Sequence, residues 1–175
     1  MSCFKPVRAI AAAAMVLAAS AALAQQAVNP MDAVPEKMPF DIPYGAPISL
    51  DRADSVLAAA LGESKKRDWK LICGVVDSGG HLVAFKRMDN AQIASIDIAM
   101  HKARAAAKFR RETKIFETAM VMNNLTYIAT LDDAIASRGG IPLVEGGKLI
   151  GAIGCSGGTG SQDEVVAKAG AALVK

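Results

Sequence analysis

Two histidines, His81 and His101, are the side chains of this sequence best suited to bind a metal or exchange protons near neutral pH. Their spacing matches neither H-x-x-x-H nor H-x-x-E-H, so we expect no dedicated zinc site. His81 directly follows Gly79-Gly80, where a side chain at the edge of a turn can project into a cleft. A single histidine at a loop edge is more often simply exposed, so both interpretations of His81 stay open.

A glycine-rich segment, residues 151–160, precedes the sequence Ser161-Gln162-Asp163-Glu164. Ser161 and Glu164 match the S-x-x-E capping box, which predicts a capped turn at the start of a helix. The alternative is a cradle for a carboxylate or phosphate, because glycine loops and helix N-termini bind anions. The loop lacks G-K-[ST], and its two acidic residues would repel a phosphate, so we favour the capped turn. The candidate anion-binding residues are Gly157, Gly158, Thr159 and Ser161.

The sequence gives little support for covalent catalysis or thiol-redox chemistry. We expect no nucleophile elbow at Ser156, and the C-x-x-C and C-x-x-C-H motifs are absent, which excludes thiol-redox pairs and covalent haem of these types. No residue is assigned a catalytic role.

The N-terminal residues 1–24 have the pattern of a secretory signal peptide. Lys5 and Arg8 precede an uncharged run over residues 9–23, which ends in Ala22-Leu23-Ala24. That run has 15 residues, fewer than the roughly 20 that a spanning helix needs. We therefore expect cleavage after Ala24, a periplasmic or secreted protein, and no stable membrane span afterwards.

The composition describes one domain rather than several. The chain has 175 residues, of which 52% are hydrophobic, enough for a real core. Loss of Lys5 and Arg8 would leave 18 basic residues against 17 acidic ones, so no nucleic-acid partner is expected. Cys73 and Cys155 would remain in a compartment that permits disulfides, but each lies in an apolar, strand-like run, and we slightly favour buried free thiols.

Residues 25–48 are predicted to form an extended arm, because five prolines forbid both a helix interior and a central strand. The arm is either a disordered linker or a strap that lies on the domain or on a neighbouring subunit. Its candidate anchors are Met38, Phe40, Ile42 and Tyr44.

The remaining residues, 49–175, predict an α+β domain. Apolar spacing predicts a helix from Ser49 to Lys65-Lys66-Arg67, and a long helix over residues 91–111 whose apolar face includes Ile93. Hairpins are expected around Gly79-Gly80 and Gly146-Gly147, helical turns at residues 115–123, and a last helix over residues 162–174. Strand pairs joined by tight turns favour an antiparallel sheet with helices packed on it.

Several blocks of this sequence, taken in order, resemble the GlcG/HbpS family. The resemblance covers most of residues 49–175 and implies a profilin-like antiparallel sheet flanked by helices, an α/β sandwich that assembles into homo-oligomers. Characterised members include extracellular haem-binding and haem-degrading proteins and a component named for glycolate utilisation. One departure is Cys155, where the family usually has an apolar residue. The matching blocks are residues 75–89, Lys102-Ala103, residues 139–142, residues 151–158 and residues 162–164.

The resemblance also implies site residues. His81 matches the position after the Gly-Gly turn that ligates haem iron in some members, and Thr113 matches a threonine proposed as the ligand in another branch. Imidazole is the stronger ligand of the two. Arg104, Lys108 and Arg111 would pair with the haem propionates, although a solvated basic face is the simpler interpretation.

Three functions follow as hypotheses. The first is an exported, oligomeric protein that binds haem non-covalently through His81, with oxidative haem breakdown as a further activity. The second is an enzyme or accessory protein that binds a small carboxylate, such as a 2-hydroxy acid, at the glycine loop. The third is a structural component of an oligomer without a ligand.

Overall fold

The computed structural model describes residues 32–175. The predicted signal peptide and residues 25–31 of the arm lie outside the described residues. The chain divides into two units, Met1–Pro39 and Phe40–Lys175, and all the helices and strands below belong to the second. No helix in the described part of the chain is long and apolar enough to cross a membrane.

Phe40–Lys175 contains four α-helices, one 3₁₀-helix and four strands among its described residues. Their order agrees with the sequence prediction of helix, hairpin, long helix, mixed segment, hairpin and helix. The elements are α2 (Leu50–Lys66), β1 (Ile72–Asp77), β2 (Leu82–Arg87), α3 (Ser95–Lys108), α4 (Lys114–Val121), η2 (Thr126–Thr130), β3 (Gly140–Glu145), β4 (Lys148–Ser156) and α5 (Gly160–Ala171).

The strands form one antiparallel sheet in the order β2-β1-β4-β3. Both hairpins turn at the predicted glycine pairs, where Gly80, Gly146 and Gly147 have positive φ. Strands β1 and β4 are central, and their side chains are buried on both faces of the sheet. This sheet and its flanking helices confirm the predicted α+β class.

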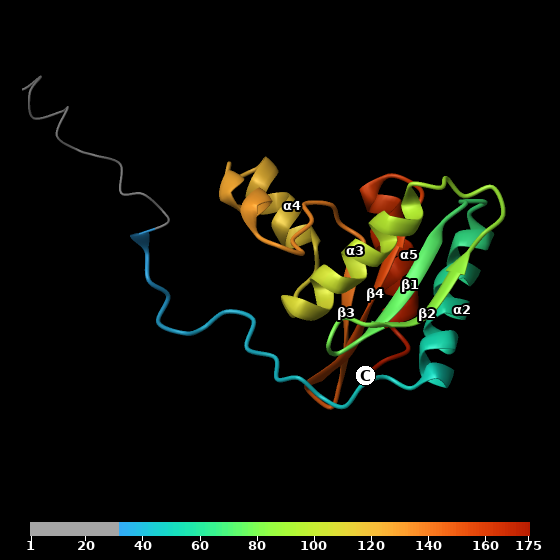
Figure 1. Cartoon of the computed structure of the whole chain (residues 1–175), viewed down its shortest axis with the longest axis horizontal. Coiled ribbons are helices and arrows are strands. Elements are labelled where there is room, and N and C mark those ends of the chain that lie inside the picture. The colour runs from blue at the N-terminus through green and yellow to red at the C-terminus, as the bar shows by residue number, and fades with distance from the viewer. Residues whose placement is uncertain (1–31) are drawn as a thin grey trace, which may run out of the picture. The chain divides into compact units, whose positions relative to one another are not determined.

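Helices cover both faces of the sheet, as Figure 1 shows: α3 lies on one face, and α2 and α5 lie on the other. The two interfaces differ in composition. Large aliphatic side chains such as Leu57 and Ile153 fill the layer between the sheet and α2 and α5. Alanines of α3 pack against Val76 and Ala152 on the opposite face. Small residues on both surfaces therefore let α3 approach the sheet closely.

Helix α3 is shorter than the predicted helix over residues 91–111. It begins at Ser95 and ends at Lys108, so Ile93 precedes it and is exposed, and Arg111 follows it. The predicted helix was too long because the turns on either side of α3 also contain apolar residues at helical spacing.

Gly154 of β4 lies directly beneath α3. A Cβ at this position would overlap the carbonyl oxygen of Ala99 and the amide nitrogen of Ala103. We therefore expect Gly154→Ala to lower the free energy of unfolding by about 3 kcal/mol, because backbone must move to admit the methyl group. Urea denaturation followed by circular dichroism measures this change.

Gly62 of α2 supplies the matched control for that prediction. Nothing lies within 4 Å of a Cβ built at Gly62. Gly62→Ala should raise stability by about 0.5 to 1 kcal/mol, as expected for an open position in a helix. Equal effects of the two substitutions would contradict the close packing of α3 on β4.

Cys73 and Cys155 are joined, which corrects the slight preference for free thiols. Cys73 and Cys155 are directly opposite each other on β1 and β4, with Cα atoms 4.2 Å apart, and they form a disulfide. Both are fully buried on the face covered by α2 and α5. Apolar surroundings suggested free thiols, but only the strand register shows that the two side chains meet.

The strap interpretation of the arm holds for residues 40–48. Leu149 donates its amide proton to the carbonyl of Pro43 over 2.8 Å, and Gly45 donates to the carbonyl of Leu149 over 2.7 Å. Ile48 is buried in the main core. This segment, called the strap below, is thus tied to the start of β4, beyond the end of the pairing between β1 and β4.

Candidate functional site

The turn between β1 and β2 holds His81 in a defined position. Oδ1 of Asp77 accepts hydrogen bonds from the amides of Gly79, at 2.8 Å, and of His81, at 2.9 Å. The amide of Asp77 donates to the carbonyl of His81, which closes the turn. The side chain of His81 is 84% exposed, so it projects outward from a rigid base.

Asp77 also orients the imidazole ring. Its Oδ1 lies 3.4 Å from Nδ1 of His81, which leaves Nε2 as the nitrogen that faces away from the carboxylate. Burial raises the pKa of Asp77, but the two amide hydrogen bonds and the nearby ring outweigh it, and the pKa falls below its ordinary value. An ionised carboxylate on one ring nitrogen is the usual support of a histidine that binds metal through the other.

A depression lies beside this turn. It has a volume of about 490 Å³ and is lined by Tyr44, Ser78, Gly79 and Lys108. The aliphatic stem of Lys108 packs near Gly80, and a Cβ at Gly79 would meet the ring of His81. The strap, the β1–β2 turn and the end of α3 therefore converge on one ligand-sized space.

Two of the predicted basic residues lie on α3, and one does not. Lys108 lines the depression and pairs with Asp133, while Arg104 is half-buried one turn earlier. Exposed ion pairs contribute little stability, so another anion can replace Asp133 beside Lys108 at little energetic cost. Arg111 instead stacks on Phe40, with its guanidinium carbon 3.7 Å from the ring centroid.

Thr113 is placed away from solvent. It is fully buried, and its hydroxyl accepts a hydrogen bond from the amide of Gly140 over 2.9 Å. Neither Thr113 nor Arg111 lines the depression beside His81. Arg111 borders a smaller cavity of about 190 Å³ among Phe109, Phe116 and Tyr127. Of the five candidate cofactor residues, only Lys108 lines the depression, and the ring of His81 lies next to its lining at Gly79.

The glycine loop after β4 forms its capping box two residues earlier than predicted. Helix α5 begins at Gly160, and Thr159 and Gln162 form the box, so the predicted pair of Ser161 and Glu164 was wrong. Thr159 already has an extended backbone and donates its amide proton to Gln162 over 2.8 Å, which fixes the cap at that position.

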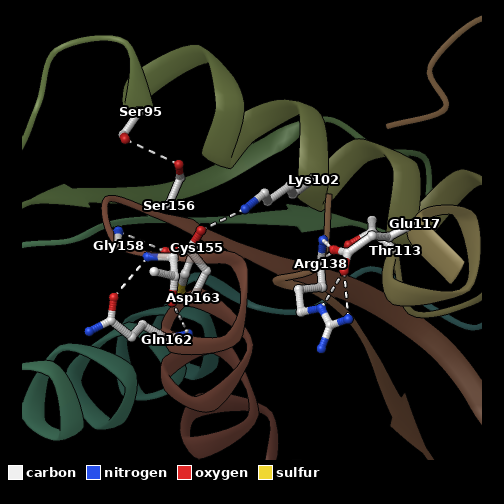
Figure 2. A network of polar contacts seen from close by, with 12 residues as sticks. Ser95, Lys102, Thr113, Glu117, Arg138, Cys155, Ser156, Gly158, Gln162 and Asp163 are labelled. Carbon is white, nitrogen blue, oxygen red and sulfur yellow. Dashed lines mark hydrogen bonds and ion pairs between the residues drawn. The ribbon is translucent and has the colours of Figure 1, made fainter. Parts of the chain in front are cut away.

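The amides of this loop already have partners within the chain. Gly158 donates to Oδ1 of Asp163 over 3.0 Å, as Figure 2 shows. Ser161 lies within α5, and its side chain makes no contact with this cradle in the described hydrogen bonds. The carboxylate of Asp163 therefore takes the place of an external anion at the amides of Gly157 and Gly158, and the side-chain oxygen of Gln162 takes that place at Thr159.

Asp163 belongs to a buried ion pair that the sequence analysis missed. Nζ of Lys102 lies 2.7 Å from Oδ2 of Asp163, and both side chains are almost completely buried (Figure 2). Burial raises the pKa of Asp163, although Lys102 and the glycine amides oppose that effect. Because α3 and α5 lie on opposite faces of the sheet, the pair links the two helical layers beside Gly139.

The spacing of α3 contained a signal for Lys102. It lies three residues after Ala99 and next to Ala103, both fully buried, so helical periodicity places it on the apolar face. Lysine at such a position requires a buried partner. Asp163, in the first turn of α5, was an available carboxylate.

Ser156 lies in a G-x-S-x-G sequence, which corrects the expectation that this motif is absent, although Ser156 is not a nucleophile. Residues 154–158 do spell G-x-S-x-G, and they join a strand to a helix as a nucleophile elbow does. The hydroxyl of Ser156, however, is buried and donates to Oγ of Ser95 over 3.1 Å. Its partner is another hydroxyl rather than a base, so the geometry does not activate Ser156.

A second polar cluster holds α4 in place. The guanidinium and amide of Arg138 both donate to the carboxylate of Glu117, and the hydrogen bond to the side chain of Arg138 lowers the pKa of Glu117 below its ordinary value (Figure 2). Glu164 accepts from Lys168 over 2.6 Å and lies near Arg138. These contacts are structural, because every charge in the cluster has an opposite charge beside it.

Comparison with protein families gives a match over residues 48–172 to the model described as "Haem degrading protein HbpS-like". The chain belongs to the HbpS-like family. Protein GlcG of Escherichia coli (strain K12) is 43% identical over 109 residues, which cover 62% of this chain and 81% of that protein. The recognised GlcG/HbpS resemblance is therefore confirmed.

Solved structures show the same HbpS-like fold. The crystal structure of HbpS has a TM-score of 0.70 at 24% identity and covers 81% of this chain and 99% of that one. The crystal structure of the PduOC:Heme complex has a TM-score of 0.67 at 22% identity, covering 74% of this chain and 96% of that one. The predicted sandwich of an antiparallel sheet between helices is thus the architecture of the family.

Proposed function

We propose that this protein binds haem non-covalently, with Nε2 of His81 as the axial ligand of the iron. One observation carries the proposal: an exposed imidazole lies 3.4 Å from the carboxylate of Asp77 and against Gly79, which lines a depression of about 490 Å³. The family description and the haem complex of a protein with the same fold point to the same ligand. Haem chemistry is therefore the function that this site supports best.

The surroundings of His81 suit the rest of the haem molecule. Lys108 is near enough to the turn to pair with one propionate, and Arg104 is a second cation on the same helix. Thr113 is a poorer candidate, because its buried hydroxyl is engaged by Gly140 and a neutral hydroxyl is a weak iron donor. We therefore assign the iron to His81 rather than to Thr113.

Export, self-association and oxidative breakdown of bound haem complete the proposal. The Cys73–Cys155 disulfide supports export, since such bonds persist in oxidising compartments. The small-carboxylate hypothesis loses support because the glycine-loop amides bind Asp163 and Gln162. Light scattering of the mature protein tests its self-association.

His81→Ala is expected to weaken hemin binding at least 10-fold, because loss of even a supporting residue of a metal ligand costs about 10- to 100-fold. Titration of hemin into the apo protein, followed at the Soret band, measures the affinity. The shape of the band should also change, since the axial ligand sets the electronic state of the iron.

His101→Ala is the matched control, because His101 lies on α3 rather than in the β1–β2 turn, and it has no carboxylate partner among the described ion pairs. It should leave the titration unchanged. Wild-type protein that binds hemin no better than an unrelated protein would overturn the haem proposal. Equal loss in the two variants would remove His81 as the ligand.

A further inference from the structure

Tyr44 is held at the depression by the backbone on both of its sides. The carbonyl of Pro43 accepts a hydrogen bond from Leu149, and the amide of Gly45 donates to the carbonyl of the same residue. Tyr44 itself forms a parallel bridge with Leu149. The strap therefore fixes the position of Tyr44 relative to β4.

The side chain of Tyr44 is fixed as well. Its hydroxyl donates to the carbonyl of Lys108, at the end of α3, over 2.8 Å. The guanidinium carbon of Arg110 lies 5.4 Å from the ring centroid, and Arg110 also donates to the carbonyl of Ile42 over 3.0 Å. The ring is thus held by three contacts: the hydrogen bond of its hydroxyl, the guanidinium group of Arg110 over its face, and the hydrogen bonds of the strap backbone.

Despite these restraints, Tyr44 is 51% exposed and lines the depression with Ser78, Gly79 and Lys108. Tyr44 is the one aromatic residue in that lining. A rigid, half-exposed aromatic ring offers a flat apolar surface at little entropic cost on binding. Simple anchoring of the strap would not require the ring to border a ligand-sized space.

We infer that Tyr44 is a ligand-binding residue that forms a wall of the depression and packs against the face or edge of a planar macrocyclic ligand. This inference rests on the proposed haem function and deepens it, because it adds a strap residue to a site otherwise built from the β1–β2 turn and α3. The wall acts on the flat organic ring, whereas His81 acts on the metal. The two contributions can therefore be measured separately.

Metal-free protoporphyrin IX and hemin are the two probes that separate them. Tyr44→Ala should weaken binding of both probes about 5- to 10-fold, which corresponds to one aromatic contact. Tyr44→Phe keeps the ring and loses only the hydrogen bond to Lys108, so it should stay within about twofold of wild type for both. Fluorescence titration follows protoporphyrin IX, and absorbance follows hemin.

Tyr44→Leu guards against a merely loosened strap, because it keeps an apolar side chain without a flat ring. It should bind both probes as weakly as Tyr44→Ala while its thermal unfolding midpoint stays close to that of Tyr44→Phe. The inference would be overturned if Tyr44→Ala left protoporphyrin IX binding unchanged. It would also be overturned if Tyr44→Phe and Tyr44→Ala lost the same affinity.

His81→Ala distinguishes failure of this inference from failure of the proposed function. It should weaken hemin binding and leave protoporphyrin IX binding unchanged, since the latter has no iron. If His81→Ala leaves hemin binding unchanged, the axial assignment fails, while the Tyr44 variants still test the wall. If wild-type protein binds neither probe, both proposals are overturned.

Discussion

Lys102→Met is expected to lower the free energy of unfolding by about 3 to 5 kcal/mol, the usual cost of leaving one member of a buried ion pair without its partner. Asp163 would keep its hydrogen bond from Gly158 but lose the ammonium that lies 2.7 Å away. Methionine nearly matches the volume and shape of the lysine stem, so the change isolates the charge. Urea denaturation of the purified protein at pH 7 measures the loss.

The loss in Lys102→Met should depend on pH, with a sign set by Asp163. Burial raises the pKa of Asp163 above that of an unfolded aspartate, so the folded state holds its proton to higher pH than the unfolded state does. Between the pKa of the unfolded state and that of the folded state, the free energy of unfolding falls as pH rises, because the unfolded state binds fewer protons. Lys102 opposes the effect of burial on the pKa of Asp163, so its loss should raise that pKa further and widen this pH range. The difference between variant and wild type should therefore be smallest near pH 4 and grow toward pH 7.

Asp163→Asn and the double variant Lys102→Met/Asp163→Asn complete a cycle for this pair. The single change leaves a buried ammonium without a carboxylate, whereas the double change removes both charges and keeps an oxygen that can accept from Gly158. The double variant should be more stable than the sum of the single losses predicts. Additive losses, or a pH-independent Lys102→Met, would contradict a coupled pair.

The sequence predicted those parts of the fold that local chemistry determines. The first helix begins directly after Ser49, as the apolar spacing predicted, and both Gly-Gly turns close hairpins. The position of His81 at the end of the first turn followed from the same local rule.

The remainder depends on contacts between distant segments, which no local pattern specifies. Lys102 and Asp163 are 61 residues apart, and their meeting requires α3 and α5 to end up on opposite faces of one sheet. Tyr44 reached the depression only because the strap pairs with the start of β4. From the sequence, Thr113 could be ranked below His81 only because a hydroxyl is the weaker iron ligand. Its complete burial depends on the tertiary structure. Register and packing, rather than composition, decided each of these cases.

The disulfide gives the second large expected effect. Cys73→Ala/Cys155→Ala should lower the free energy of unfolding by about 4 kcal/mol, because the bond closes a loop with a sequence separation of 82 residues and so restricts the unfolded chain. Alanine leaves no unpaired polar group in the aliphatic layer where the two sulfurs lie. Urea denaturation of wild type and variant, under identical non-reducing conditions, measures the difference.

Reductant provides the internal control for this effect, and its outcome also bears on export. A strong reductant should destabilise the wild type toward the variant and leave the variant unchanged, because the variant has no disulfide to lose. Both sulfurs are fully buried, so reduction should proceed only as fast as the domain opens. Two blockable thiols in wild-type protein purified from an oxidising compartment would contradict the bond. A loss of about 4 kcal/mol is a large fraction of the roughly 5 to 15 kcal/mol that stabilises a typical domain, so a measured loss of this size would support the proposal that the protein is exported to an oxidising compartment.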